Sequence, residues 1–239
     1  MKKTIGILIL AISVMGQNCV VKAENEKYSG AAAVQYAKAY CSEYNESFPS
    51  FAADCTNFVS QCVGAGGIKE VTLPEKKVGL LEYGRTYMCK DYWSCRYYTN
   101  KVLGVTIRKG YVPTSTWTVV DQPDDASSYG FQDFMKKNKE KGVVTYTCNK
   151  DKNIESLIKK AKVGDIVQYK SEGKNRYTHS YIVGKKQKNP KQKNKTDLYF
   201  YAHSGSSGGR DASDDDTLRY LLKNDTIRRE ASLALISMQ

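Results

Sequence analysis

The change of hydrophobic period along the chain constrains its fold more than any other sequence feature. Apolar residues recur every three or four positions in the first part of the chain and alternate after about residue 164. Helical spacing predicts helices at 30–44, from 55 to about 63, around 131–135 and at 154–161. Alternation predicts strands at 165–169, 179–184 and 198–203. We therefore expect an α+β fold in which N-terminal helices pack on a small antiparallel sheet.

Residues outside these segments mark the ends of the elements. Ser29 is placed to cap the first helix, and the glycine-rich run 64–67 ends the second. A further short helix is expected at 218–222. The stretch 83–120, rich in Tyr, Trp and Thr, predicts loops and short strands around a cleft. Residues 185–195 are rich in lysine and predict a solvated loop, with binding to the cell wall as the alternative.

The N-terminus has the pattern of a secretory signal peptide. Two lysines precede an apolar run from Ile5 to Met15, and a short polar stretch ends at Ala23. The apolar run is shorter than the roughly 20 residues that cross a bilayer, so we expect cleavage after Ala23 and no stable membrane insertion. This predicts residues 1–23 as a signal peptide and 24–239 as a single domain that is secreted and extracellular or associated with the wall.

The exported part of the chain would be strongly basic. The sequence carries a net charge of +12, and cleavage would remove Lys2, Lys3 and Lys22, which leaves 12 − 3 = +9. Such a charge favours association with the anionic polymers of a bacterial wall, or it serves only solubility. We expect anionic wall polymers as partners, no nucleic acid and a monomer.

Six cysteines follow the predicted cleavage site, and an exported protein can form disulfides. They are Cys41, Cys55, Cys62, Cys89, Cys95 and Cys148. Cys89 and Cys95 flank a short aromatic loop and are the first choice for a bridge, although connectivity cannot be read from sequence. If Cys55 is a free nucleophile, at least one of the other five is also unpaired.

Cys55 is the strongest candidate for a catalytic residue. It opens the second predicted helix, directly after Asp54, which can act as the N-cap. The positive end of a helix dipole lowers the pKa of a thiol, and the free N–H groups of the first turn can donate to an oxyanion. The alternative is a structural cysteine bridged to Cys62. Seven residues of helix rise about 10 Å, which is beyond the reach of a disulfide.

The sequence has two histidines, His179 and His203, and both fall in predicted strands. If these strands are antiparallel neighbours, a register with His179 opposite His203 places both side chains on one face of the sheet. The other pairs of this register are Tyr181 with Tyr201 and Val183 with Tyr199. One imidazole could then take the thiol proton of Cys55 while the other orients it. The same three residues could bind zinc, which we rank lower because Cys-X-X-Cys spacing is absent, so no metal and no cofactor are expected.

Segments between residues 28 and 205 resemble, in order, a known family. Asp54–Gln61 is similar to the nucleophile motif of the "putative amidase" family of secreted bacterial proteins and to the Asp-Cys-Ser segment of NlpC-type wall peptidases. Gly164–Tyr169, His179–Val183 and Tyr201–Ser204 resemble the Gly-Asp strand, the His strand and the third triad member of both. The pairs Tyr92-Trp93 and Tyr97-Tyr98, with Ser115–Trp117, resemble the central segment of the amidase family.

The resemblance implies a papain-like fold, as in NlpC-type and CHAP-type enzymes, and hydrolysis of an amide through a thioester. Cys55 would attack, His179 would act as base and then as acid, and His203 would orient His179. Asp54 and Thr56 match positions that hold the substrate's amine in NlpC-type enzymes, with helix capping as the alternative.

Trp117 could line the substrate cleft, although a buried tryptophan is equally ordinary. The substrate that the resemblance implies is peptidoglycan or another peptide.

Two other functions stay open from the sequence. The first is a wall- or surface-binding protein that keeps the fold without catalysis. It predicts that a triad member is missing, and all three candidates are present. The second is a protease or transferase that uses the same residues on protein substrates, since fold and triad do not determine the substrate.

Overall fold

The computed structural model describes residues 28–121, 127–138, 144–170, 176–203, 209–224 and 232–238, with only the backbone for 144–153. The helices are α1 (Gly30–Tyr40), α2 (Cys55–Ala65), α3 (Ser115–Thr118), α4 (Phe131–Lys137), α5 (Lys150–Lys160) and α6 (Leu218–Lys223), with short 3-10 turns at Glu75–Lys77 and Pro190–Gln192. The strands are β1 (Cys95–Val102), β2 (Val105–Pro113), β3 (Val144–Asn149), β4 (Ile166–Lys170), β5 (His179–Asn189), β6 (Lys195–His203), β7 (Gly209–Asp211) and β8 (Ser232–Ser237). The predicted signal peptide lies outside the described residues.

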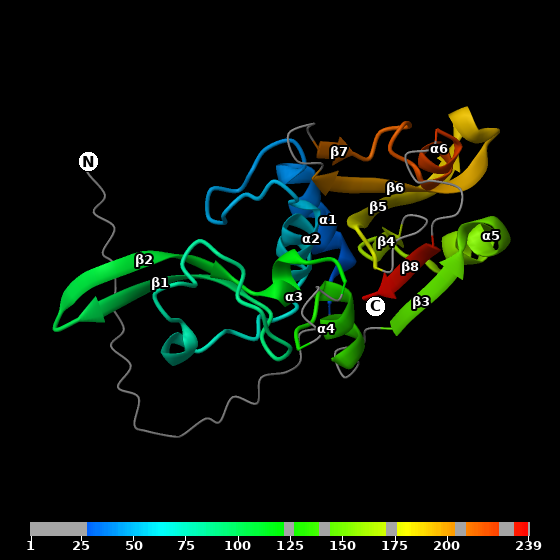
Figure 1. Ribbon diagram of the computed structural model, residues 1–239. Coiled ribbons are helices and arrows are strands. Elements are labelled where there is room, and N and C mark those ends of the chain that lie inside the picture. The colour runs from blue at the N-terminus through cyan, green and yellow to red at the C-terminus, as the bar shows by residue number, and fades with distance from the viewer. Residues whose placement is uncertain are drawn as a thin grey trace, which may run out of the picture.

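A six-stranded antiparallel sheet with the order β3-β8-β4-β5-β6-β7 forms the centre of the molecule. Helices α1 and α2 contact β5 and β6, and helices α5 and α6 lie on the other side, against β3, β6 and β8 (Figure 1). Each face of the sheet therefore contributes to its own apolar cluster. The predicted α+β class, with N-terminal helices on an antiparallel sheet, is confirmed.

The two N-terminal helices begin and end where the sequence indicates. The Ser29 side chain accepts a hydrogen bond from the backbone N–H of Ala32 at 3.2 Å and so caps α1. Helix α2 is buried from Cys55 to Val63, which places it between the sheet and the rest of the molecule. It ends at Gly66, whose N–H donates to the carbonyl of Cys62 at 2.9 Å.

The Gly164-Asp165 pair joins the start of β4 to two distant segments. Gly164 has a φ of +91°, and a Cβ there would collide with the backbone of Gly30 at the start of α1. One carboxylate oxygen of Asp165 accepts from the N–H of Lys162 at 2.8 Å, and the other accepts from the N–H of Met238 at 2.9 Å. The Gly164-Asp165 pair therefore connects the start of β4 to the start of α1 and to the residue that follows β8.

The strands expected within 83–120 are β1 and β2, which form a two-stranded arm that extends away from the body (Figure 1). The loop expected at 185–195 is wrong, because β5 continues to Asn189 and β6 starts at Lys195, so only a short connection remains. These exposed strands form backbone ladders without burying an apolar face, so their sequence lacks the alternation that predicts strands.

The expected disulfide between Cys89 and Cys95 is not formed. All five cysteines whose side chains are described, which are Cys41, Cys55, Cys62, Cys89 and Cys95, are free thiols. The thiol of Cys89 donates to the carbonyl of Tyr92 at 3.6 Å, whereas Cys95 is buried in the apolar core. The side chain of Cys148 lies outside the described part of the chain.

Of the helices in the described ranges, none is both long enough and apolar enough to cross a membrane.

Candidate functional site

Cys55 is the first residue of α2, as the sequence predicts, and only 5% of it is exposed. Its sulfur lies 3.7 Å from the hydroxyl oxygen of Thr56, and the backbone of Ser180 on β5 also hydrogen-bonds to it. The apolar neighbours of Cys55 are Val120, Tyr177 and Ala234. The α2 N-terminus therefore meets the start of β5 at this thiol.

Burial dominates the ionisation of Cys55. Desolvation raises the pKa of the thiol above its ordinary value, while hydrogen bonds from Ser180 and Thr56 lower it by less. The helix N-terminus alone predicted a lowered pKa, and that prediction is wrong. The resting side chain is a neutral thiol, so catalysis at neutral pH requires a group that removes its proton.

Asp54 and His203 form a buried pair beside Cys55. Nδ1 of His203 lies 2.5 Å from Oδ2 of Asp54, and Nε2 lies 2.7 Å from the carbonyl oxygen of Tyr40. Because a carboxylate and a carbonyl both accept, His203 donates from both nitrogens when it is an imidazolium. Tyr40 is the last residue of α1, where a positive charge is favoured by the helix dipole. His203 thus ties the end of β6 to α1 and to the residue before Cys55.

Asp54 does not cap α2 through its side chain, so the capping alternative is wrong. Its Oδ1 accepts from the N–H of Phe51 and from Nδ2 of Asn57, both at 2.9 Å. With His203 on Oδ2, both carboxylate oxygens are engaged, and the residue is 1% exposed. In the resting structure Asp54 therefore positions the start of α2.

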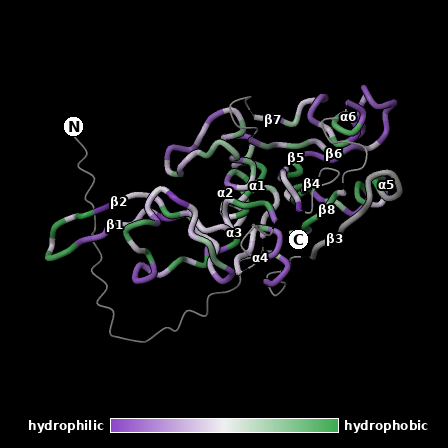
Figure 2. Tube along the Cα trace, in the orientation of Figure 1, coloured by the Kyte–Doolittle hydropathy of each residue, from purple (hydrophilic) through white to green (hydrophobic). Residues whose placement is uncertain are grey.

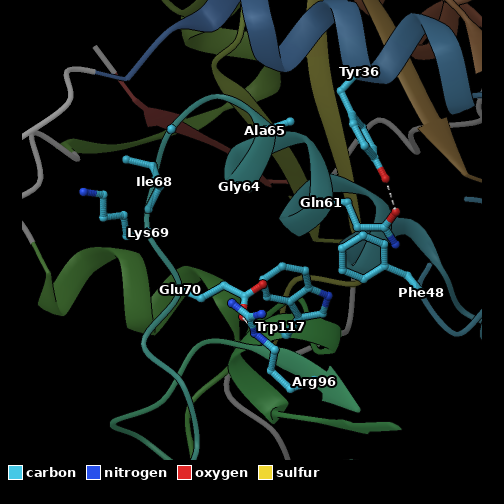
Figure 3. A pocket seen from close by; sticks show the side chains of 11 residues that line it. Tyr36, Phe48, Gln61, Gly64, Ala65, Ile68, Lys69, Glu70, Arg96 and Trp117 are labelled. Atoms are coloured by element: carbon cyan, nitrogen blue, oxygen red, sulfur yellow. Dashed lines mark hydrogen bonds and ion pairs between the residues drawn. The ribbon is translucent and has the colours of Figure 1, made fainter. Parts of the chain in front are cut away.

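Trp117 reaches this pair through one further hydrogen bond. Its indole N–H donates to Oδ1 of Asn57 at 2.8 Å, and the tryptophan is 1% exposed. It also lines a groove of about 550 Å³ together with Tyr36, Phe48, Gln61, Glu70 and Arg96, among others (Figure 3). Cys55 is not one of the residues that line this groove. Trp117 therefore lines a groove that does not include Cys55, and its predicted contact with substrate stays a prediction.

A chain of buried polar side chains, which the sequence analysis missed, runs from the Cys55 helix into the body. The hydroxyl of Thr56 lies 3.2 Å from that of Ser180, and Nε2 of Gln168 donates to Ser180 at 3.0 Å. Nε2 of Gln132 then donates to Oε1 of Gln168 at 2.9 Å, and Lys136 donates to Gln132 at 2.7 Å. Only the polar Gln168 within an otherwise apolar strand could have indicated this chain.

His179 and His203 lie on opposite faces of the sheet, because the register of β5 and β6 differs from the predicted one by one residue. Tyr201 lies opposite Ile182, whereas the prediction paired it with Tyr181. Since side chains alternate, this shift separates the two histidines, so the predicted juxtaposition is wrong. Both faces of these strands are apolar and covered by helices. Hydrophobic alternation therefore could not select the register.

The ring of His179 lies among aromatic side chains. Its centroid is 4.4 Å from that of Tyr181 and 5.7 Å from that of Tyr169. Burial, with a smaller contribution from the charge of Arg210, lowers the pKa of His179 to about 4. The imidazole is therefore neutral at pH 7 and able to accept a proton. It precedes Ser180, whose backbone contacts the Cys55 sulfur, although its own ring points away from α2.

Among the described side chains, no group of three His, Cys, Asp or Glu residues is arranged to hold a metal ion. The zinc alternative would need Cys55, His179 and His203 together, and the two histidines are separated by the sheet.

A family model described as "Putative amidase domain" matches residues 27–217. The chain is also similar to the "Uncharacterized protein YhbB" of Bacillus subtilis (strain 168), with 26% identity over 162 residues. That match covers 68% of this chain and 39% of YhbB, so the chain corresponds to less than half of that protein. No solved structure matches.

Proposed function

Because this chain belongs to the putative amidase domain family, we propose that it is a secreted cysteine hydrolase of papain-like type that cleaves amide bonds with Cys55 as nucleophile. The family indicates hydrolysis of amide bonds. The observation that supports Cys55 is the position of its thiol at the first turn of α2, in contact with the backbone of Ser180. An oxyanion formed next to this sulfur would meet free backbone N–H groups of the helix.

The proposed reaction has two steps. His179 takes the proton of the Cys55 thiol while the sulfur attacks the amide carbon, and the same proton then passes to the departing amine. This leaves a thioester, which water hydrolyses with His179 again acting as base. The imidazole is neutral at pH 7 and so can accept the proton, but a pKa of about 4 makes it a weaker base than an ordinary histidine. In the resting structure this ring lies beside Tyr169 and Tyr181, on the face of the sheet opposite α2, so the proposed step requires the start of β5 to rearrange when substrate binds.

His203 takes a different role in this proposal from the one that the sequence suggested. Its two ring nitrogens contact Asp54 and the carbonyl of Tyr40. We therefore assign His203 and Asp54 to positioning the start of α2 rather than to orienting His179. Thr56 supports the same start through Ser180.

The proposed substrate is a peptide of bacterial peptidoglycan. Two features support it: the signal-peptide pattern of residues 1–23, and the net charge of +9 that remains after cleavage, which suits an anionic wall. N-terminal sequencing of the exported protein should begin at Glu24. An intact N-terminus on protein retained in the cytoplasm would contradict the proposed secretion.

The test is incubation with purified peptidoglycan and, separately, with unfolded protein, followed by mass analysis of released fragments. Peptidoglycan fragments that disappear with Cys55→Ala but persist with the matched thiol variant Cys89→Ser support the proposal. Fragments only from unfolded protein would indicate a protease instead. Binding to the wall without release of any fragment would favour the non-catalytic protein.

Variants of the two histidines then separate their roles. His179→Ala should abolish turnover with little loss of stability at pH 7. His203→Gln should lower stability as well as rate, because it releases a buried carboxylate. If His179→Ala retains full turnover while a folded His203→Gln has none, His203 is the base and this assignment is wrong.

A further inference from the structure

The β1–β2 arm has an apolar free end. Its base packs against the body through Leu73, Val78, Tyr83, Tyr98 and Val112. Beyond that cluster, the side chains at the end of the arm are exposed: Val102 by 54%, Leu103 by 100%, Val105 by 63% and Ile107 by 52%. Figure 2 shows this end as a hydrophobic tip at a distance from the body. An exposed apolar tip of this kind is typical of a surface that contacts another molecule.

The turn at the tip carries an unfavourable residue. Val102 pairs with Val105, so Leu103 and Gly104 form a two-residue turn with φ values of 49° and 81°. Both central residues are in the left-handed region, where Asn-Gly or Asp-Gly is favoured and a leucine is strained. The sequence thus places a fully exposed leucine where a polar residue would suit both the backbone and water. This points to a requirement for the apolar side chain itself.

The arm is also uniformly basic. Between residues 95 and 113 the charged residues are Arg96, Lys101, Arg108 and Lys109, with no acidic residue. Arg96 is paired with Glu70 in the body, whereas Lys101 and Lys109 are exposed behind the tip. An apolar tip followed by cations matches the boundary of an anionic bilayer, where acyl chains lie beneath phosphate groups.

We propose that the tip of the β1–β2 arm docks the protein reversibly on an anionic lipid surface, with Leu103 entering the acyl boundary and Lys101 and Lys109 facing the phosphates. A wall polymer would use the cations but offers no apolar interior for Leu103. A stable contact between two proteins takes about 20–30 residues on each side, whereas the apolar tip has four. Docking is separate from the chemistry proposed for Cys55, so Cys55→Ala should bind lipid as the wild type does.

The decisive readout is local to the tip. Leu103→Trp places an indole there, while the native Trp93 and Trp117 are buried. With vesicles that contain phosphatidylglycerol, the emission of this variant should shift to the blue and be quenched by brominated acyl chains. With vesicles of phosphatidylcholine alone, both effects should be much weaker. Wild-type protein gives the background emission. Because the indole reports only on position 103, membrane contact by the apolar residues 5–15 does not change the signal. An indole that stays exposed to water with both vesicles overturns the proposal.

Binding of full-length variants to the same vesicles distinguishes a loss of lipid affinity from a loss of folded structure. Leu103→Asn removes the apolar group but favours the turn, so affinity should fall about tenfold or more while thermal stability is kept or raised. Val102→Thr with Val105→Thr, which keeps β-branched residues in the strands, should weaken binding in the same direction. Unchanged affinity in both variants would exclude insertion of the tip.

The charge variants have a matched control. Lys101→Gln and Lys109→Gln should each weaken binding to phosphatidylglycerol vesicles about fivefold. Lys188→Gln and Lys195→Gln remove equal charge from exposed positions on β5 and β6 and should change it little. If the lysine variants of both regions weaken binding equally and Leu103→Asn leaves the affinity unchanged, the protein binds polyanions through its charge, and the proposed insertion of the tip is wrong. If Leu103→Asn instead abolishes self-association in the absence of lipid, the tip joins two copies and the proposal is wrong.

Discussion

The thiol of Cys55 is subject to two opposing influences at the residue scale. The start of α2 favours the thiolate, and the buried surroundings favour the neutral thiol. Burial is the larger effect, and the pKa is raised. Burial is also the largest influence on His179, but it lowers the pKa there, because the charged form of histidine is the protonated one. A neutral thiol and a neutral imidazole are the states from which general-base catalysis starts.

Alkylation of Cys55 should therefore depend steeply on pH. Because the pKa of the thiol is raised, the rate with iodoacetamide should still increase above pH 9 rather than level off at mildly acidic pH. Thr56→Val removes the hydroxyl next to the sulfur and should slow the reaction further. Peptide mapping by mass spectrometry between pH 6 and about 10 gives the rates. A plateau below pH 7 would reveal a preformed thiolate and contradict this expectation.

The stability of the fold should fall in acid partly through His179. Its pKa is about 4 in the folded protein, against about 6.5 when unfolded. The unfolded state therefore binds more protons below pH 6.5, and the contribution of the neutral histidine, up to about 3 kcal/mol, is lost as the pH falls from 6.5 to 4. Denaturant unfolding across this range measures the loss. His179→Gln should show a shallower decline, and identical slopes would refute the assignment.

At the scale of elements, one buried hydrogen-bonded pair connects three segments that are distant in sequence. His203 at the end of β6 contacts Asp54 before α2 and the C-terminal carbonyl of α1. The histidine ring also stacks on Phe58, with 4.1 Å between ring centroids. These contacts fix the N-terminus of α2 relative to the sheet, and hence the place of Cys55.

A double-mutant cycle can measure this connection. Asp54→Asn and His203→Gln each leave a buried hydrogen-bonding partner unmatched and should cost about 1–3 kcal/mol of unfolding free energy. The double variant should cost clearly less than the sum, with a coupling above about 1 kcal/mol. Urea unfolding at pH 7 supplies the values. Strict additivity would mean that the two side chains do not stabilise each other.

For the molecule as a whole, the C-terminal strand is central although the family match ends at residue 217. β8 lies between β3 and β4. Leu235 faces the cluster that contains α5 and α6, and Ile236 faces the cluster under α1 and α2. The last strand of the chain therefore contributes to the core on both sides of the sheet.

Truncation after residue 231 should abolish the folded state. It removes five buried side chains, Leu233, Ala234, Leu235, Ile236 and Met238. It also leaves β3 without a neighbouring strand and β4 with an unpaired edge. Circular dichroism and protease resistance would detect the loss, and removal of Gln239 alone serves as the control. A truncated protein that unfolds cooperatively with near wild-type stability would show that β8 is dispensable.

The sequence alone determined most of the helices of this protein and three strands of its central sheet. Apolar spacing predicts the helices α1, α2, α4, α5 and α6 and the strands β4, β5 and β6. Each of these elements buries one or both faces, so its apolar residues recur with the period of a helix or a strand. The place of Cys55 at a helix N-terminus follows from the same pattern. The α+β class could be predicted for that reason, whereas the exposed arm could not.

Only the tertiary structure decided how these elements meet. The register of β5 and β6 separates His179 from His203, because strands that are apolar on both faces fit two registers equally well by sequence. The partners of Asp54 and His203 come from α1 and β6, which no local pattern links. The raised pKa of Cys55 likewise depends on the surfaces that cover it. Local propensity is set by neighbours along the chain, whereas register, burial and ionisation are set by neighbours in space.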